Sequence, residues 1–486
     1  MHVQFIDQTL RDGQQSLWGL RMRAHQATPA LGHIDRTGFR VVDLTGAGMF
    51  QVLTRTFADD PWESTDILIN GMPGSGTRAA LRTISVVGMG FAPDAIIDLW
   101  VRTFVKHGIK SFWIYDCLYD MPVMKRLADV ILDAGADVAP AIMYGLTPVH
   151  DDAFFAEKAR EISSWPGVKT VYVEDAPGVL TPERARTLLP ALQQATGETP
   201  IELHVHNTTG LAPLVYIEGL NCGIDILHTA SRPMANGPSL PATEDMIEIL
   251  DMLGHTHSLD TKQLEPVADH FEAEAIRSGY ELGVPNPYSL RPYQHQLPGG
   301  MTGTLKSQLA QHGMEERLNE VLQETMLVRE ELGEPIMATP FSQFVGIQAV
   351  LNIVTGDRYA VVPDEVIQYA HGHYGPLARP IEPEAADRIF AAPRAKHFAT
   401  WERPQPTLKE IRDGFGRQIS DEELLLRWSM SDAEVDRTIA SGSVSRKSRA
   451  YTPDLVREVS ELLAGAKRLR RASVQLPGLS VSVGRQ

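Results

Sequence analysis

Two histidines separated by one residue, His204 and His206, end a β-rich run at residues 200–206. Side chains alternate along a strand, so both imidazoles are expected on the same face, where they can bind one ion. Asp12 follows another β-rich run near the N-terminus. A carboxylate and two imidazoles suit zinc or manganese, with coordination positions left open for a substrate oxygen. From the residues alone, a hydrogen-bonded polar cluster that holds no ion is the alternative.

Two arginines, Arg11 and Arg82, are expected to flank this position. A guanidinium binds a carboxylate through two parallel hydrogen bonds, so in an acidic protein this pair indicates an anionic substrate. Structural ion pairs with Asp12 or Asp116 are the alternative.

These residues lie near the ends of short β-rich runs that alternate with amphipathic, helix-length runs up to about residue 255. Such alternation predicts parallel βαβ units, and eight of them predict a TIM (β/α)8 barrel. In that fold the reactive groups lie where the strands end, which also draws attention to Gln15 and Glu174. The eight candidate strands are residues 3–9, 39–44, 82–87, 111–118, 138–144, 168–174, 200–206 and 224–229.

Two of the connecting helices are clear from the sequence. Residues 93–108 carry an apolar stripe at helical spacing, with Pro93 in the first turn and Gly108 at the exit. Residues 181–197 begin with Thr181 as a capping residue and end at Gly197. Their apolar faces are expected to pack on the barrel.

After residue 255 the alternation fades and the chain becomes mostly helical, so we predict a barrel domain at 1–255 and a mainly helical domain at 256–445. Within the latter, residues 421–441 predict two short helices. Residues 446–486 predict a linker, a helix at about 454–469 and one strand within VQLPGLSVSV. We expect the basic cluster of this tail to be a solvated face, with docking of an acidic partner as the alternative; the cluster consists of Lys467, Arg468, Arg470 and Arg471.

Composition narrows the class of protein. The 45 Lys and Arg residues against 61 Asp and Glu residues give a net charge of −16, which excludes a simple basic nucleic-acid-binding protein. Cys117 and Cys222 cannot form a disulfide framework or a structural zinc site, so a reducing compartment is expected. Charged residues within the first 16 positions argue against a signal peptide or membrane anchor. We therefore expect a cytoplasmic protein with no membrane span.

The segment DQTLRDGQQSLWGLRM resembles the opening signature of the pyruvate/oxaloacetate carboxyltransferases. These form the catalytic barrel of pyruvate carboxylase, the oxaloacetate decarboxylase alpha subunit and the transcarboxylase 5S subunit. TLRD and the histidine pair also occur in a wider metal-dependent barrel superfamily, which includes isopropylmalate synthase and hydroxymethylglutaryl-CoA lyase. The likeness covers roughly residues 3–360, and YQHQLPGGM and ATPFSQFVG are its more specific motifs.

The resemblance implies that Asp12, His204 and His206 bind a divalent metal (Zn, Mn or Co). It assigns Arg82 and Gln15 to a keto-acid substrate, with Arg11 in the same pocket, and gives Thr339 the relay of a proton between substrate and biotin. The implied reaction moves a carboxyl group from carboxybiotin to a carbon next to a carbonyl, through an enolate that the metal and an arginine stabilise.

Glu174 departs from the family pattern, because it stands where a carboxylated lysine supplies a fourth metal ligand. A glutamate is shorter by about 4–5 Å at ordinary bond lengths. We expect Glu174 to be a direct or water-bridged ligand, with pairing to an arginine or a protonated histidine as the alternative. Gly13, Gln14 and Asn207 also differ from the family pattern, as do Ala176 and Pro177, which favours a substrate other than pyruvate.

The sequence contains no lysine between two methionines, the usual biotin-attachment site, and no glycine-rich ATP-grasp region. The resemblance therefore implies a separate biotin carboxyl carrier and a separate biotin carboxylase subunit, with at least a homodimer of this chain. The basic tail is a candidate for docking one of these partners. Two alternatives remain, namely an aldol or Claisen lyase or synthase of the same superfamily and a non-catalytic scaffold.

Overall fold

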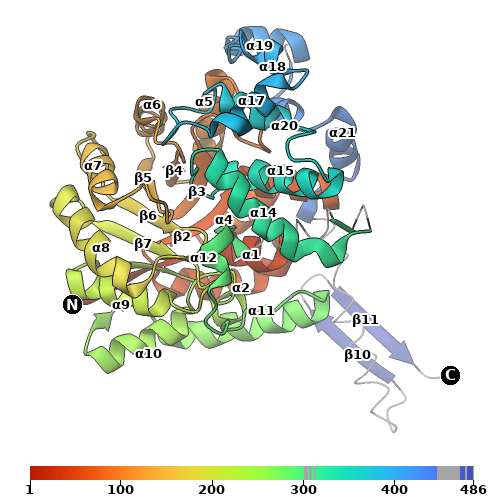
Figure 1. Cartoon of the computed structure of the whole chain (residues 1–486). Helices are drawn as coiled ribbons and strands as arrows, with labels where there is room; N and C mark the ends of the chain where they lie inside the picture. The colour runs from red at the N-terminus through yellow and green to blue at the C-terminus, as the bar shows by residue number, and fades with distance from the viewer. Residues whose placement is uncertain are drawn as a thin grey trace.

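The computed structural model describes residues 1–299, 301, 305, 309–310, 313–416 and 418–445, and the backbone of 471–476 and 479–484. Within this part, eight parallel strands form a closed barrel (Figure 1). Neighbouring strands pair in chain order from β1 to β8, and β1 pairs with both β2 and β8 to close the ring. The strands are β1 (His2–Asp7), β2 (Val41–Gly46), β3 (Thr77–Arg82), β4 (Ser111–Tyr115), β5 (Asp137–Met143), β6 (Val171–Asp175), β7 (Ile201–Val205) and β8 (Ile226–Thr229).

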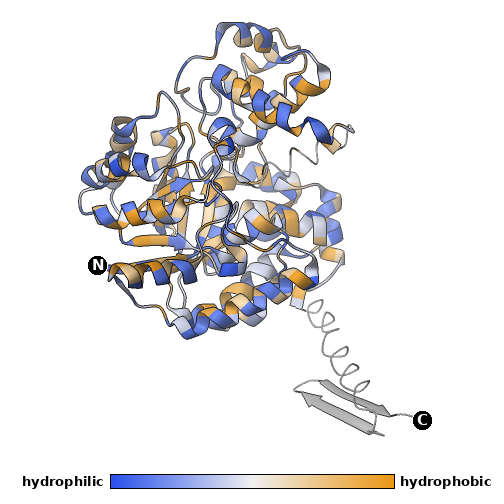
Figure 2. Cartoon of the chain, turned by 60° about the horizontal axis from the view of Figure 1, so that its bottom comes forward, coloured by the Kyte–Doolittle hydropathy of each residue, from blue (hydrophilic) through white to orange (hydrophobic). Residues whose placement is uncertain are grey.

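Amphipathic helices surround the barrel, and in Figure 2 they carry hydrophilic and hydrophobic residues side by side. The predicted stripe of residues 93–108 is confirmed: α5 buries Ile97, Trp100 and Phe104 completely. The helices of this region are α1 (Gln14–Trp18), α2 (Ala24–Thr37), α3 (Ala47–Val52), α4 (Pro61–Asn70), α5 (Asp94–Lys106), α6 (Met121–Asp133), α7 (Asp152–Ser163), α8 (Pro182–Thr196), α9 (Ala212–Cys222) and α10 (Thr243–Leu253), with the shorter turns η1 (Thr9–Gly13), η2 (Leu53–Phe57) and η3 (Arg232–Met234).

The start and end of α8 follow the predicted signals. The Thr181 hydroxyl accepts a hydrogen bond from the Arg184 amide at 3.1 Å. The helix ends at Thr196, and Gly197 follows with a φ of +61°, a backbone conformation that glycine adopts without a Cβ clash.

A helical region follows the barrel, as predicted, and it includes the two short helices expected at 421–441. The short strand β9 (Thr256–His257) pairs with the start of β1, and the domain boundaries at 255 and 445 stay predictions. The helices are η4 (Thr261–Gln263), α11 (Leu264–Ser278), α12 (Arg291–His295), η5 (Glu315–Arg317), α14 (Leu318–Glu331), α15 (Phe341–Thr355), α16 (Asp364–Ala370), α17 (Pro383–Ala391), α18 (Ala395–Phe398), α19 (Leu408–Phe415), α20 (Asp421–Ser429) and α21 (Asp432–Ala440).

The helical region packs against the end of the barrel at which the strands finish. Arg329 of α14 donates to the Leu146 carbonyl, just after β5, at 2.9 Å. The Cys117 thiol, just after β4, lies 3.9 Å from the Thr339 carbonyl. The segment before α15 therefore reaches the mouth of the barrel.

Two predicted strands were wrong in detail. Residues 82–87 were expected to form the third strand, but the strand is Thr77–Arg82, so Arg82 ends it. The prediction failed for two reasons. The buried Arg78 interrupts the apolar pattern of the true strand, and the apolar run after Arg82 resembles a strand but forms no pairing with a neighbouring strand. In the tail, β10 (Arg471–Leu476) and β11 (Leu479–Gly484) form an antiparallel pair where one strand was expected.

The predicted tail helix at 454–469 lies outside the described residues, as do Lys467, Arg468 and Arg470. No helix in the described ranges is long and apolar enough to span a bilayer.

A buried ion pair crosses the barrel interior. Arg78 on β3 donates to both carboxylate oxygens of Glu202 on β7, at 2.6 and 3.0 Å, and both side chains are less than 5% exposed. Burial opposes ionisation of Glu202, but the Arg78 guanidinium holds the pKa of this carboxyl well below its usual range.

We expect Arg78→Met to destabilise the fold, because it leaves the Glu202 charge buried without its main partner. Breaking such a pair costs about 3–5 kcal/mol, so the urea midpoint of unfolding should fall clearly, as followed by tryptophan fluorescence. Arg186→Met is the control, since Arg186 pairs with Glu218 at 2.7 Å on the surface. Equal shifts in both variants would contradict a special role for the buried pair.

Candidate active site

The predicted ligand residues Asp12, His204 and His206 come together inside the barrel. The Asp12 Oδ2 atom lies 3.0 Å from His204 Nε2 and 3.2 Å from His206 Nε2. The two imidazole nitrogens are themselves 3.2 Å apart. Asp12 comes from η1 after β1, whereas both histidines come from β7 and its end, so closure of the barrel brings them together.

This triangle fits a divalent cation. Bonds of about 2.0–2.2 Å to one ion place neighbouring ligand atoms about 3.0–3.4 Å apart. Among the described residues, Asp12, His204 and His206 are the His, Cys, Asp and Glu side chains whose ligand atoms gather within 4.8 Å of one another. All three are buried, and the two nitrogens and one oxygen match the ligand preference of zinc and related metals.

Hydrogen bonds outside the triangle orient its members. Ser16 donates to the second oxygen of Asp12 at 2.8 Å. The Nδ1 atom of His206 lies 2.6 Å from the Pro238 carbonyl, which can only accept, so Nδ1 carries a proton. The Nε2 atom of His206, which lies in the triangle, is therefore the nitrogen that can bind a metal once its proton is displaced.

Charge is balanced within the triangle. Burial opposes ionisation of Asp12, but the Arg11 guanidinium, 3.0 Å from its carboxylate, and the His206 ring together hold the pKa of Asp12 well below its ordinary value. Burial lowers the pKa of His204 well below the ordinary value, so this ring is neutral. For His206 the Asp12 carboxylate outweighs burial and raises the pKa to about 9.

A cavity of about 370 Å³ opens in front of the triangle. It is lined by residues of the barrel and of the helical region. His204 lies behind the cavity wall and is fully buried. The barrel supplies most of the lining, and Thr339 comes from the segment before α15. Of the residues predicted for the site, the cavity is lined by Arg11, Asp12, Gln15, Arg82, Glu174, His206 and Thr339.

The two arginines have different surroundings. Arg11 pairs with Asp12, as the structural alternative expected, and its guanidinium lies 5.1 Å from the centre of the Trp113 ring. Arg82 donates through Nη2 to the Val86 carbonyl at 2.8 Å. Its Nη1 atom is buried and has no hydrogen-bond partner among the described residues. Arg82 is thus anchored at one nitrogen and able to donate from the other.

Glu174 lines the cavity but does not belong to the ligand triangle. Two ligands of one ion are separated by at most about twice the bond length, roughly 4.2 Å, so in this arrangement Glu174 fits a water-bridged contact better than a direct one. Its Oε2 atom is buried without a partner among the described residues. Burial raises the pKa of Glu174 to about 7, against the opposing effect of Arg11.

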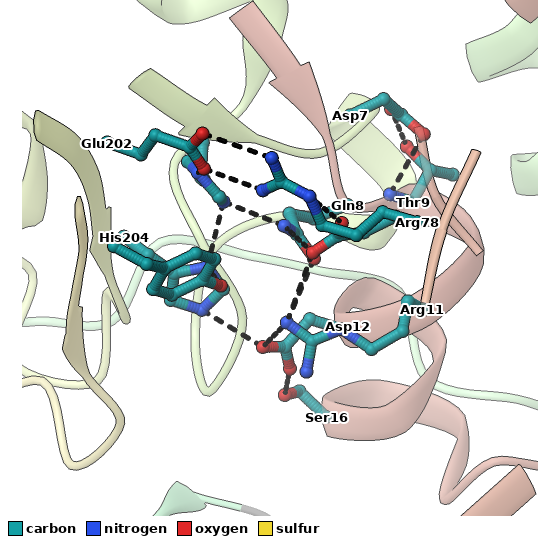
Figure 3. Close-up of polar contacts among 12 residues, drawn as sticks. Asp7, Gln8, Thr9, Arg11, Asp12, Ser16, Arg78, Glu202 and His204 are labelled. Carbon is teal, nitrogen blue, oxygen red and sulfur yellow. Dashed lines mark hydrogen bonds and ion pairs between the residues drawn. The ribbon is translucent and has the colours of Figure 1, made fainter. Parts of the chain in front are cut away.

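Behind the triangle lies a polar layer that the sequence patterns did not indicate as part of the site (Figure 3). It links Arg11 through Gln8 to Asp43, and His204 to Tyr172 and His228. One sequence feature could have indicated Glu202. It is spaced by two residues from His204 and by four from His206, so along a strand all three side chains face the barrel interior. The residues of this layer are Gln8, Asp43, Arg78, Tyr172, Glu202 and His228.

Comparison with known proteins identifies the relatives of this chain. It is 34% identical over 391 residues to a pyruvate carboxylase subunit of Methanocaldococcus jannaschii, covering 80% of this chain and 68% of that protein. It is 30% identical to the methylmalonyl-CoA carboxyltransferase 5S subunit of Propionibacterium freudenreichii, covering 77% and 74%. The 2-oxoglutarate carboxylase large subunit of Hydrogenobacter thermophilus is 30% identical, with 87% of this chain and 66% of that protein covered.

The chain belongs to the pyruvate/oxaloacetate carboxyltransferase family. The resemblance seen in the sequence is confirmed, and this protein is a biotin-dependent carboxyltransferase enzyme.

Family and structure comparisons agree with this assignment. The family described as a conserved carboxylase domain matches residues 293–435, and one described as HMGL-like matches residues 123–270. The carboxyl transferase domain of Rhizobium etli pyruvate carboxylase superposes with a TM-score of 0.81 at 25% identity, covering 90% of this chain and 77% of that structure. The match spans the barrel and the helical region together.

We expect Glu174→Gln to weaken binding of Zn²⁺ or Co²⁺ about tenfold, at the low end of the 10–100-fold effect of groups that support metal ligands. Asp12→Asn should weaken it further, because it removes a direct ligand charge. Competition with a chromophoric chelator measures both affinities. Glu274→Gln, at a buried carboxylate hydrogen-bonded to Gln26, is the control. Unchanged metal affinity and turnover in Glu174→Gln would show that Glu174 is structural.

Proposed function

We propose that this enzyme moves a carboxyl group from carboxybiotin, held on a separate carrier protein, to the carbon next to the carbonyl of a small keto acid. The observation that carries the proposal is that members of the metal-ligand triangle, two arginines and Thr339 line the same cavity. These groups match the three tasks of the reaction, which are binding an anion, stabilising negative charge on oxygen and moving a proton.

The acceptor is a pyruvate-like acid or an altered carbonyl substrate. Arg82 supports a carboxylate or enolate oxygen in this cavity, because its buried Nη1 can donate hydrogen bonds that no described protein group accepts. Gln15 is exposed at the cavity and can add a further donor to the same substrate. Relatives named as pyruvate and 2-oxoglutarate carboxylases support a 2-oxo acid.

Asp12, His204 and His206 would hold a divalent cation (Zn, Mn or Co), with Glu174 reaching it through water. Such an ion supplies Lewis acidity toward a substrate carbonyl. Arg11 and Arg82 add fixed positive charge near the position where the enolate forms, and preorganised charge of this kind is worth several kcal/mol in water-poor sites. Thr339 would carry the proton lost by the substrate carbon to the biotin ring as the carboxyl group leaves it.

The partners follow from the same proposal. We infer a biotin carboxyl carrier and a biotin carboxylase subunit on other chains, and a homodimer or larger assembly of this chain. Relatives named as subunits support the separate carrier and carboxylase chains. A cytoplasmic location stays a prediction from the sequence.

The proposed function can be tested in the decarboxylation direction. Purified protein should convert oxaloacetate to pyruvate and CO₂ faster when free biotin is added, and chelation should remove that stimulation until Zn²⁺ or Co²⁺ is restored. Purification from the native host should retain a biotinylated partner that avidin detects. Absence of both, with condensation of an acyl-CoA and a keto acid instead, would favour the aldol or Claisen alternative.

We expect Thr339→Ala to lower kcat by about 10²–10⁴-fold, the usual contribution of a positioned proton-transfer group. Thr339→Ser keeps the hydroxyl and should recover most of the rate. Steady-state kinetics of biotin-dependent decarboxylation measure both variants, and metal affinity should match the wild type. Equal activity of the alanine and serine variants would contradict the proton-relay role.

A further inference from the structure

The side-chain amide of Gln8 links Arg11, which pairs with Asp12, to His228, which lies beside His204. It follows β1 and is completely buried. Its Oε1 atom accepts from Arg11 Nη2 at 3.0 Å, and its Nε2 atom lies 2.6 Å from Asp43 Oδ2. The same Nε2 atom lies 2.7 Å from Nδ1 of His228. The amide therefore uses its oxygen toward Arg11 and both of its N–H groups toward Asp43 and His228.

The orientation of this amide is determined by its neighbours. A guanidinium can only donate, so the atom facing Arg11 has to be the Gln8 oxygen. The nitrogen then faces His228, and an amide nitrogen can only donate as well. His228 Nδ1 is consequently an acceptor without a proton.

His228 therefore carries its proton on the other nitrogen. Because Nδ1 accepts a hydrogen bond, the single N–H of the ring is on the other nitrogen. That N–H is on Nε2 and lies 3.3 Å from Glu202 Oε2. Glu202 is held as a carboxylate by Arg78, so it accepts this hydrogen bond.

The protonation of His228 determines that of His204. Their Nδ1 atoms are 3.2 Å apart, and two unprotonated nitrogens facing each other at this distance repel. Because His228 Nδ1 has no proton, His204 Nδ1 carries one, and the Tyr172 hydroxyl oxygen at 2.6 Å accepts it. The Nε2 atom of His204 then keeps its electron pair toward Asp12 and His206. The Asp12 carboxylate oxygen, 3.0 Å away, also only accepts, so these two atoms fit a cation bound between them.

We propose that Gln8 is a positioning residue that, through His228, fixes His204 in the form able to bind a metal. The inference rests on the proposed metal site and deepens it. Gln8 does not contact the ion position; it acts by selecting which nitrogen of His204 is protonated. A ring protonated at Nε2 would first have to move that proton before a metal could bind.

The substitution Gln8→Glu separates this role from simple electrostatics. The oxygen that replaces the Gln8 nitrogen lies against Asp43, with which it shares a proton, and it accepts from His228 Nδ1. His228 Nδ1 then carries a proton and faces His204 Nδ1 as a donor. His204 is left protonated on Nε2, so affinity for Zn²⁺ should fall about 10–100-fold, the range measured for groups that orient metal ligands. Added negative charge by itself would raise the affinity for a cation, so the two explanations predict opposite signs.

Chelator competition with the full-length protein measures the affinity, and thermal melting of the metal-free variants reports folding. Gln348→Glu is the matched control, because Gln348 is also completely buried and its amide also donates two hydrogen bonds, to Asn352 and Val361. This control should bind Zn²⁺ as the wild type does. Unchanged or tighter binding in Gln8→Glu would overturn the inference.

A second variant covers the case in which Gln8→Glu does not fold. Tyr172→Phe removes the acceptor of the His204 proton and should also weaken Zn²⁺ binding about 10–100-fold. Tyr369→Phe removes an equally buried hydroxyl, one that donates to the Leu332 carbonyl, and should leave binding unchanged. Equal affinities of the two tyrosine variants would overturn the tautomer inference alone, whereas a wild-type protein that binds no metal would overturn the proposed metal site with it.

Discussion

The structure depends on one constraint: the charges of Arg78 and Glu202, buried inside the barrel, must be paired with each other. Barrel interiors of this fold are usually filled by branched apolar side chains. Here one layer holds Arg78 and Glu202, with Gln8 and His228 between them and the ligand triangle. An unpaired charge at such depth is very unfavourable, so each member fixes the position of the next. The triangle at Asp12 is the end of this layer that opens to the cavity.

The polar layer contacts the ligand triangle from behind, while the helical region completes the wall of the cavity in front of it. Strand ends from the barrel supply the ligand triangle and both arginines, and Thr339 enters from the segment before α15. Contacts such as Arg329 to the Leu146 carbonyl hold that segment against the barrel mouth. The candidate site is therefore shared between two regions that the sequence presents as separate.

Sequence patterns predicted the parts of the fold that depend on neighbours along the chain. The spacing of His204 and His206 along one strand placed both imidazoles on one face, and Thr181 and Gly197 marked the ends of α8. The position of the third strand was predicted wrongly because Arg78 is charged, and a buried arginine is not expected in a strand. Its burial is explained by the ion pair with Glu202 across the barrel. Glu174 was expected as a direct or water-bridged metal ligand, and the sequence could not choose between the two forms because the choice depends on the distance from β6 to Asp12.

The sequence by itself determined the family, the order of strands and helices and the identity of the candidate ligands, because motifs and periodicity are local properties of a chain. Only the tertiary structure decided that Asp12 meets the histidine pair, since β8 lies between β1 and β7 and closure of the ring sets their separation. It also decided that Thr339 shares their cavity and that Gln8 reaches His228. These contacts join residues far apart in the chain, and no local pattern encodes such distances.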